Sequence, residues 1–212
     1  DESAGKNLVK ELGQDERTFI SMDVKKVEDI ENMAQRAKDM YDSVDVLVNN
    51  AGIWRPGSVV QLEEKRWDSV LDVNLKGYYL VSKNIIPLME EGGSIVNMAS
   101  VAGLVGAKEA SAYNASKGGV VNLTRAMALD FADQGIRVNC VTPGLIDSAQ
   151  GEQVVSYYTD STDPDDVGAN WQPLPVVGKP EHISPMVAFL ASEKTSFATG
   201  GIFTVDGGLT AE

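Results

Sequence analysis

Two residues with an obvious capacity for chemistry, Tyr113 and Lys117, stand four positions apart in the segment Tyr113-Asn114-Ala115-Ser116-Lys117. On a helix this spacing places a phenol and an ammonium on one face, within reach of a common ligand. A phenol has an ordinary pKa of about 10, and a neighbouring cation favours its charged form. A lysine cation beside a phenol could therefore tune that phenol for proton transfer. Taken alone, the spacing is common, and a purely structural pair is the better interpretation.

Other polar and small residues follow predicted strands at the points where those strands end. Ser100 comes just after the apolar stretch 94–98, residues 49–52 (Asn-Asn-Ala-Gly) end the stretch 44–49, and residues 143–148 (Pro-Gly-Leu-Ile-Asp-Ser) follow the stretch 137–141. Ligands bind beyond the carboxyl ends of the strands in open α/β sheets. The small side chains would also let a ligand approach the backbone closely.

A further amide, Asn74, lies in Asp72-Val73-Asn74-Leu75-Lys76-Gly77, where a predicted helix is interrupted. Judged singly, Asn74 is a helix-bending polar residue, Ser100 is a turn or cap, and residues 49–52 are a tight turn. Together with Tyr113 and Lys117 they favour one ligand site.

The elements that must position these residues alternate between short Val- and Ile-rich runs and longer helical patterns, which predicts an α/β fold with a parallel sheet. The predicted strands are Thr18 to Met22, Val44 to Asn49, Ser94 to Met98, Arg137 to Val141 and Ile202 to Val205. Long helices are expected over Leu62 to Met89 and Ala110 to Gln134, with a crossover helix whose apolar face starts at Val27. Residues 150–175 are expected to form one long irregular excursion of the kind that is often a lid. The whole chain, 1–212, is predicted to be a single domain.

Composition narrows the classes of function. The 212 residues carry a formal net charge of −13, so nucleic acid is an unfavourable partner. No stretch resembles a signal core or a membrane span, and the one cysteine, Cys140, excludes an intrachain disulfide, which fits a cytoplasmic protein. The one histidine, His182, is expected at a surface or helix-cap position, and too few His and Cys residues are present for a clustered metal site.

Read jointly, these motifs resemble the short-chain dehydrogenase/reductase family, in particular members acting as 3-oxoacyl-carrier-protein reductases or as sugar and alcohol dehydrogenases. The resemblance implies a Rossmann-like, doubly wound sheet and hydride transfer between a nicotinamide cofactor and a small-molecule alcohol or carbonyl. It implies a catalytic tetrad of Asn74, Ser100, Tyr113 and Lys117. In it Tyr113 is the general acid–base, Lys117 tunes the phenol and holds the ribose, Ser100 steadies the substrate oxygen, and Asn74 positions a relay water.

The same resemblance implies cofactor contacts and an assembly. The adenine side is expected at Asp23 and Val24, the ribose side at Asn50, Ala51 and Gly52, and the nicotinamide at Pro143, Gly144, Ile146 and Ser148, together with Tyr113 and Lys117. The cofactor is expected to be NAD or NADP, with NAD favoured, the excursion 150–175 is expected to bind substrate, and no metal is needed. Relatives with this layout pair their long helices and last strand, which implies a homotetramer.

One departure from the family concerns the beginning of the chain. No Gly-x-x-x-Gly-x-Gly pattern precedes Asp23, so the first strand, first helix and second strand of the family fold are expected to lie upstream of Asp1, with the residue that selects the cofactor. Residues 1–5 would begin the helix after the second strand. The stretches 18–22 and 44–49 should then leave room for two strands and should not pair directly.

Two other classes of function compete with this interpretation. A catalytically silent relative could serve as a scaffold or regulatory binder, although the intact tetrad argues against it. A serine hydrolase would need a Gly-x-Ser-x-Gly elbow around Ser100, which is absent. Tyr157, Tyr158 and Trp171 either line a substrate pocket or pack a loop, and Trp54, Lys108 and Glu109 are expected at the pocket edge.

Overall fold

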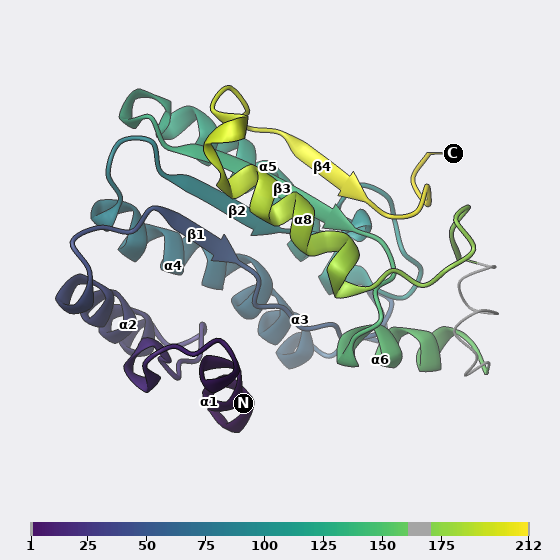
Figure 1. Cartoon of the computed structure of the whole chain (residues 1–212). Coiled ribbons are helices and arrows are strands. Elements are labelled where there is room, and N and C mark those ends of the chain that lie inside the picture. The colour runs from purple at the N-terminus through teal and green to yellow at the C-terminus, as the bar shows by residue number, and fades with distance from the viewer. Residues whose placement is uncertain (1, 161–170, 212) are drawn as a thin grey trace.

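The computed structural model describes residues 2–160 and 171–211. In this part of the chain four parallel strands form one sheet in the order β1-β2-β3-β4 (Figure 1). The strands are β1 (Val46–Asn49), β2 (Ser94–Met98), β3 (Arg137–Pro143) and β4 (Ile202–Val205). Four of the five predicted strands are therefore confirmed, with β1 starting slightly later and β3 ending slightly later than expected.

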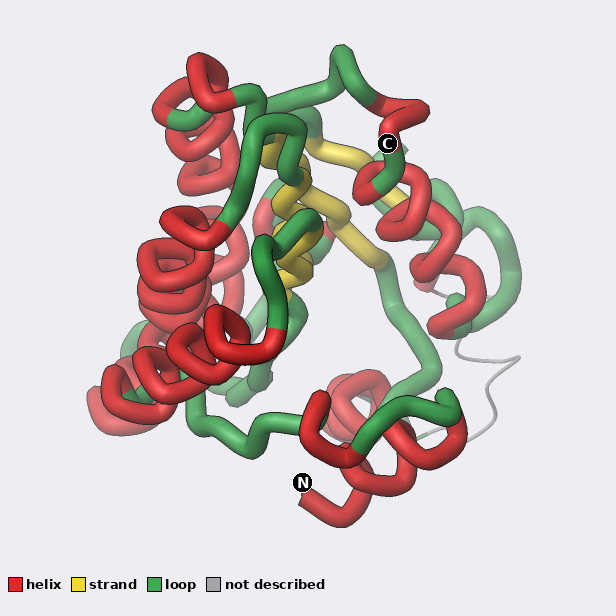
Figure 2. Tube along the Cα trace, turned by 60° about the vertical axis from the view of Figure 1, so that its left-hand side comes forward, coloured by secondary structure: helices red, strands yellow, loops and turns green. Residues whose placement is uncertain are grey.

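The sheet has helices on both faces, which is the predicted doubly wound, Rossmann-like arrangement (Figure 2). One face packs against α4 (Gly77–Ile85) and α5 (Ser111–Asp130), and α2 (Val27–Met40) lies against α4. The other face packs against α8 (Pro180–Ala191). Every residue of β2 is buried, as expected for a parallel strand covered on both sides.

The remaining helices surround this core. Among the described residues they are α1 (Glu2–Glu11), α3 (Glu64–Leu71) and α6 (Ala149–Tyr158). Short 3₁₀ turns cover Glu16–Thr18, Ile86–Leu88, Val101–Gly103, Ala132–Gln134 and Glu193–Thr195. The helix predicted from residue 1 onward is thus confirmed as α1, and the helix predicted over 110–134 ends as α5 followed by a 3₁₀ turn.

The interruption predicted near Asn74 is a change of helix type. A π-helical turn, Asp72–Lys76, joins α3 to α4, and the Gly77 N–H donates to the Asp72 carbonyl five residues back. Such wider turns occur often at functional sites because they re-aim a side chain without ending the helix. Here the side chain of Asn74 is completely buried.

The strand predicted at 18–22 is wrong. Thr18 belongs to a 3₁₀ turn in which its hydroxyl donates to the Asp15 carbonyl at 2.7 Å, while the Asp15 carboxylate accepts from the Arg17 N–H at 2.9 Å. Residues 19–22 pair with no described strand. Local hydrogen bonding to Asp15 thus prevails over the β propensity of the sequence at Thr18.

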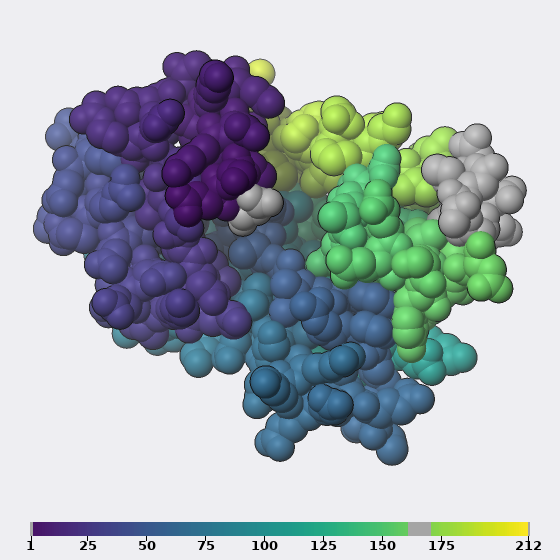
Figure 3. All heavy atoms as spheres, turned by 90° about the horizontal axis from the view of Figure 1, so that it is seen from below, coloured from purple at the N-terminus to yellow at the C-terminus, as the bar shows by residue number. Residues whose placement is uncertain are grey.

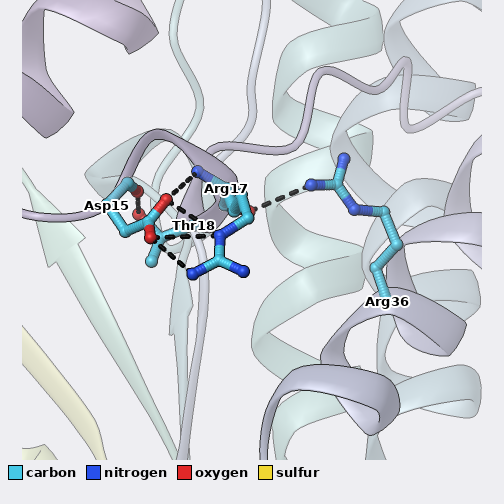
Figure 4. A network of polar contacts seen from close by, with 4 residues as sticks. All are labelled: Asp15, Arg17, Thr18 and Arg36. Carbon is cyan, nitrogen blue, oxygen red and sulfur yellow. Dashed lines mark hydrogen bonds and ion pairs between the residues drawn. The ribbon is translucent and has the colours of Figure 1, made fainter.

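The same corner ties the N-terminal segment to α2. Arg36 of α2 donates to the Arg17 carbonyl at 3.0 Å, and the Arg17 guanidinium also binds both Asp15 oxygens (Figure 4). Because these contacts lie on the surface, they add little to the stability of the fold. Their main effect is to fix the N-terminal segment beside α2.

Two further predictions need adjustment around the excursion and β1. Residues 150–175 are not irregular throughout, because α6 occupies 149–158; residues 161–170 lie outside the described part.

The edge of β1 that faces away from β2 pairs with no strand of the described residues, and Val46 and Val48 of β1 are about 40% exposed. The prediction that 18–22 and 44–49 do not pair is confirmed.

Candidate active site

The carboxyl ends of β1, β2 and β3 open into a cavity of about 1040 Å³. Figure 3 shows this end of the molecule hollowed between the N-terminal segment, in purple, and the α6 segment, in green. Most residues predicted for the site line this one cavity: Asn50, Gly52, Ser100, Tyr113, Lys117, Pro143, Gly144, Ile146 and Ser148.

Tyr113 and Ser100 reach the cavity from adjoining elements. Ser100 ends the run of β2 and caps the turn Val101–Gly103, accepting from the Ala102 N–H at 3.2 Å, while Tyr113 lies in the first turn of α5. The turn packs on α5 so closely that a side chain on Gly103 would lie 2.6 Å from the Lys117 carbonyl oxygen. Glycine at 103 is therefore what allows the turn that follows Ser100 to lie this close to α5.

Lys117 lies one helical turn beyond Tyr113 and is 3% exposed. Its Nζ donates to the Met98 carbonyl at 2.7 Å, and it lies 5.4 Å from the ring centre of Tyr78 and 5.8 Å from that of Tyr113. Burial lowers the pKa of Lys117 to about 8, because the charged form loses water. An ammonium has three donors, so two remain for a ligand in the cavity.

The sequence-based expectation that Lys117 favours the phenolate of Tyr113 stays a prediction, because burial dominates the pKa of Tyr113 in this structure. Burial raises the pKa of Tyr113, and hydrogen bonds from Ser100 and Gln150 offset that rise only in part. Lys117 Nζ lies over the Tyr113 ring, 5.8 Å from its centre, and donates to the Met98 carbonyl.

Asn74 does not line the cavity itself. Its Nδ2 donates to the Ile53 carbonyl at 2.9 Å and to Ser116 Oγ at 3.1 Å, and its Oδ1 accepts from the Ile53 N–H at 2.8 Å. Both amide donors are therefore used within the protein. A side chain on Gly52 would lie 3.7 Å from Asn74 Oδ1 and 3.5 Å from Lys117 Nζ, so the missing Cβ leaves one small space next to both groups.

The segment 143–148 leads from β3 into α6. Ser148 caps α6 by accepting from the Gly151 N–H at 3.1 Å, and Gln150 follows in the first turn, where its Nε2 donates to Tyr113 Oη at 3.4 Å. Gln150 was not predicted as a site residue. Its position two residues after the N-capping Ser148 is the signal that places it at the start of a helix over the site.

Three predicted cofactor residues lie elsewhere. Val24 and Ala51 line a separate apolar groove of about 430 Å³ along the open edge of β1, which shares Val48 and Asn50 with the large cavity. Asp23 lines neither hollow; its carboxylate accepts from the Lys25 N–H at 3.0 Å and stabilises the turn before α2.

The aromatic residues separate into two groups. Trp54, Tyr158 and Trp171 line the cavity, whereas Tyr157 packs behind them with its ring centre 5.4 Å from that of Trp54. Lys108 and Glu109 do not line the cavity, but they hold the two tyrosines: the Tyr158 hydroxyl donates to the Lys108 carbonyl and the Tyr157 hydroxyl to Glu109 Oε2 at 3.1 Å.

Metal binding and membrane insertion find no support in the described residues. No group of three or more His, Cys, Asp or Glu side chains is placed to hold a metal ion, and no helix there is long and apolar enough to cross a membrane. His182 caps α8 by accepting from the Lys179 N–H at 3.0 Å, as the sequence predicts.

Known proteins share this architecture. A family profile described as enoyl-(acyl carrier protein) reductase matches residues 1–210. A 3-oxoacyl-[acyl-carrier-protein] reductase of Thermotoga maritima is 38% identical over 182 residues, which cover 85% of this chain and 72% of that protein. The ligand-free aldohexose dehydrogenase of Thermoplasma acidophilum superposes with a TM-score of 0.85 at 37% identity, covering 91% of this chain and 78% of that one.

A third similar structure contains a cofactor. It is a 4-hydroxyisoleucine dehydrogenase complexed with NADH, with a TM-score of 0.76 and 32% identity, covering 90% of this chain and 80% of that one. No support emerges for a catalytically silent scaffold. By sequence and by structure, the chain belongs to the short-chain dehydrogenase/reductase family and is a nicotinamide-dependent oxidoreductase acting on alcohol or carbonyl groups.

Proposed function

We propose that Tyr113 is the general acid–base of this oxidoreductase, that Ser100 orients the substrate oxygen, and that Lys117 and Asn74 support the route of the proton. The observation that carries the proposal is the contact of the Tyr113 phenol with Ser100 and Gln150 at the wall of the large cavity. A substrate oxygen placed beside Ser100 would therefore be within reach of a transferable proton.

The protonation state of Tyr113 favours a defined direction at each pH. Because burial raises the pKa of Tyr113, the phenol holds its proton at neutral pH and can donate it to a carbonyl oxygen during reduction. During oxidation the phenolate must take the hydroxyl proton, so higher pH favours that direction. The Ser100 hydroxyl hydrogen-bonds the reacting oxygen in either direction.

The space beside Gly52 suits a water molecule that continues the proton route. It adjoins both Lys117 Nζ and Asn74 Oδ1, which can donate to and accept from a water there. Asn74 also fixes Ile53 and thereby the backbone beside Gly52. In this proposal Asn74 is chiefly a positioning residue.

The residues present fit a nicotinamide cofactor, because the missing Cβ of Gly52 leaves the backbone open beside the two spare donors of Lys117. When bound, the cofactor exchanges a hydride with the carbinol carbon of the substrate. Lys117 would hold the ribose hydroxyls, and Ile146 and Ser148 the carboxamide. Further contacts are proposed at Pro143, Gly144, Asn50 and Ala51, with Val24 and Asp23 toward the adenine. NAD is the proposed cofactor, supported by the NADH bound to a similar structure.

We also propose that the chain forms one domain and assembles as a cytoplasmic homotetramer. Large apolar side chains stand exposed on α5 and near α8 and β4, including Leu129 at 81% and Phe197 at 103% exposure. Patches of this kind are typical of interfaces. Light scattering at the monomer mass would contradict the assembly.

The test of this function is Tyr113→Phe, assayed by absorbance of reduced nicotinamide with a panel of alcohols and ketones. Loss of the phenolic oxygen should abolish turnover and leave the circular dichroism spectrum unchanged. Tyr79→Phe, which removes the same atom from a tyrosine that is 49% exposed on α4, is the matched control. Wild-type rates in Tyr113→Phe would refute the proposal.

A further inference from the structure

We infer that the substrate is an uncharged alcohol or ketone whose body is an apolar ring or short apolar chain, packed against an aromatic wall made of Trp54, Tyr158 and Trp171. The inference rests on the proposed function, because it requires the reacting oxygen to lie at Ser100 and Tyr113. It adds the chemical class of substrate, which the family alone does not specify.

The aromatic wall is a continuous set of ring contacts on one side of the cavity. The ring centres of Trp54 and Tyr158 are 6.1 Å apart, and those of Tyr158 and Trp171 are 5.7 Å apart. Behind the wall, Tyr157 packs edge-on against Tyr158 at 5.0 Å. Separations of 4.5–7 Å are those of favourable aromatic pairs, so the rings hold one another in place without a ligand.

The polar atoms of the tyrosines are engaged away from the substrate. The Tyr158 hydroxyl donates to the Lys108 carbonyl, and the Tyr157 hydroxyl donates to Glu109. Glu109 has a φ of 50°, a left-handed conformation that is costly for a residue with a side chain. The strained residue is the one that holds Tyr157. The wall therefore offers ring carbon atoms to the cavity, and a sugar would find few hydrogen-bond partners on it.

The cavity also lacks a partner for a substrate anion. Among the described residues that line it, Lys117 is the one cationic side chain, and the proposed function assigns its two spare donors to the cofactor ribose. Arg55 and Lys108 flank the wall but do not line the cavity, and Arg55 donates to the Trp54 carbonyl. A carboxylate or phosphate buried here would remain unpaired. The free energy lost by burying that charge exceeds the free energy gained from contact with the apolar wall.

The size of the substrate follows from α6. Gln150, Val154 and Tyr158 stand four residues apart and all line the cavity, so one face of α6 runs from the Tyr113 phenol to the wall. At 1.5 Å per residue this face is about 12 Å long, which accommodates one ring with a small substituent.

The test compares cyclohexanol with 4-hydroxycyclohexanecarboxylate, with the neutral carboxamide of that acid as a size control, and with glucose. We expect kcat/KM for cyclohexanol and for the carboxamide to exceed that for the carboxylate at least about 30-fold, the factor expected for one unpaired buried charge. Trp171→Leu should raise KM for cyclohexanol about 10-fold with kcat nearly unchanged, since the wall binds the substrate body and not the reacting oxygen.

Binding is followed separately by fluorescence in Trp67→Phe, in which Trp54 and Trp171 are the two remaining tryptophans of the three in the chain. Cyclohexanone should quench this fluorescence, while glucose and the carboxylate should not. Preference for the carboxylate or glucose in turnover or in quenching would overturn the inference and leave the function intact. Quenching by cyclohexanone without turnover of any alcohol would instead overturn the proposed function.

Discussion

Replacing Lys117 by methionine is expected to stabilise the folded chain while it lowers turnover. Methionine has a similar length and no charge, so it fills the space between the rings of Tyr78 and Tyr113. In the native protein the ammonium is buried, and its pKa falls from 10.5 to about 8. At about 1.4 kcal/mol for each tenfold change, holding the charge at neutral pH costs about 3 kcal/mol.

The variant also loses a favourable contact. The hydrogen bond from Nζ to the Met98 carbonyl is worth about 1 kcal/mol, although the Tyr78 hydroxyl continues to donate to the same oxygen at 3.1 Å. The net expectation is a gain of about 2 kcal/mol in the free energy of unfolding at pH 7, or about 4–8 °C in melting temperature for a chain of this size.

The dependence on pH has a definite sign. Between pH 8 and 10.5 the native Lys117 has lost its proton and the unfolded one has kept it, so the wild type gains stability as pH rises. The advantage of Lys117→Met should therefore be full below pH 8 and should vanish above 10.5. Urea unfolding of both proteins across this range, without cofactor, measures it. A Lys117→Met protein that is less stable than wild type at pH 7, with a difference independent of pH, would refute the reasoning.

The same variant should bind the cofactor more weakly and react more slowly, and a change in rate alone would argue against the role of Lys117 in holding the ribose. Ser100→Ala should lower kcat about 100-fold with the fold intact, as removal of one hydrogen-bond donor to a reacting oxygen does in other enzymes; steady-state kinetics test it, and an unchanged kcat would exclude Ser100. Asn74→Ala removes the three hydrogen bonds of a buried amide and should cost about 2–4 kcal/mol in urea unfolding, whereas a loss below about 0.5 kcal/mol would contradict its positioning role. Gly103→Ala should cost about 1–3 kcal/mol and reduce turnover, because its methyl group meets the α5 backbone; a fully active, stable variant would show that the close approach is unnecessary.

Much of the fold is predictable because local patterns and burial agree. The runs at β2 and β4 were bounded correctly, since β2 is buried on both faces and β4 lies between clear turn signals. The exception at 18–22 is instructive. Its residue types favour a strand, but a strand also needs a partner ladder, and Asp15 offers Thr18 a local hydrogen bond instead.

The site was predictable to the extent that its residues follow strand ends. Ser100, Tyr113, Lys117 and the segment 143–148 meet in one cavity because parallel strands end at one edge. What the sequence could not supply is side-chain direction. The engagement of Asn74 by Ile53 and of Lys117 by Met98 depends on helix packing. The contact between Gln150 and Tyr113 also depends on helix packing, because these two residues lie far apart in the chain.

The dependence of both reaction directions on pH tests the central claim about Tyr113 most directly. If Tyr113 is the general acid–base, kcat/KM for oxidation of a responsive alcohol should rise with pH, by up to tenfold per pH unit below the controlling pKa. Reduction of the matching ketone should fall as pH rises through the same pKa. Both dependences should be lost, together with turnover, in Tyr113→Phe. Profiles that are flat in the wild type, or that persist unchanged in Tyr113→Phe, would show that another group transfers the proton.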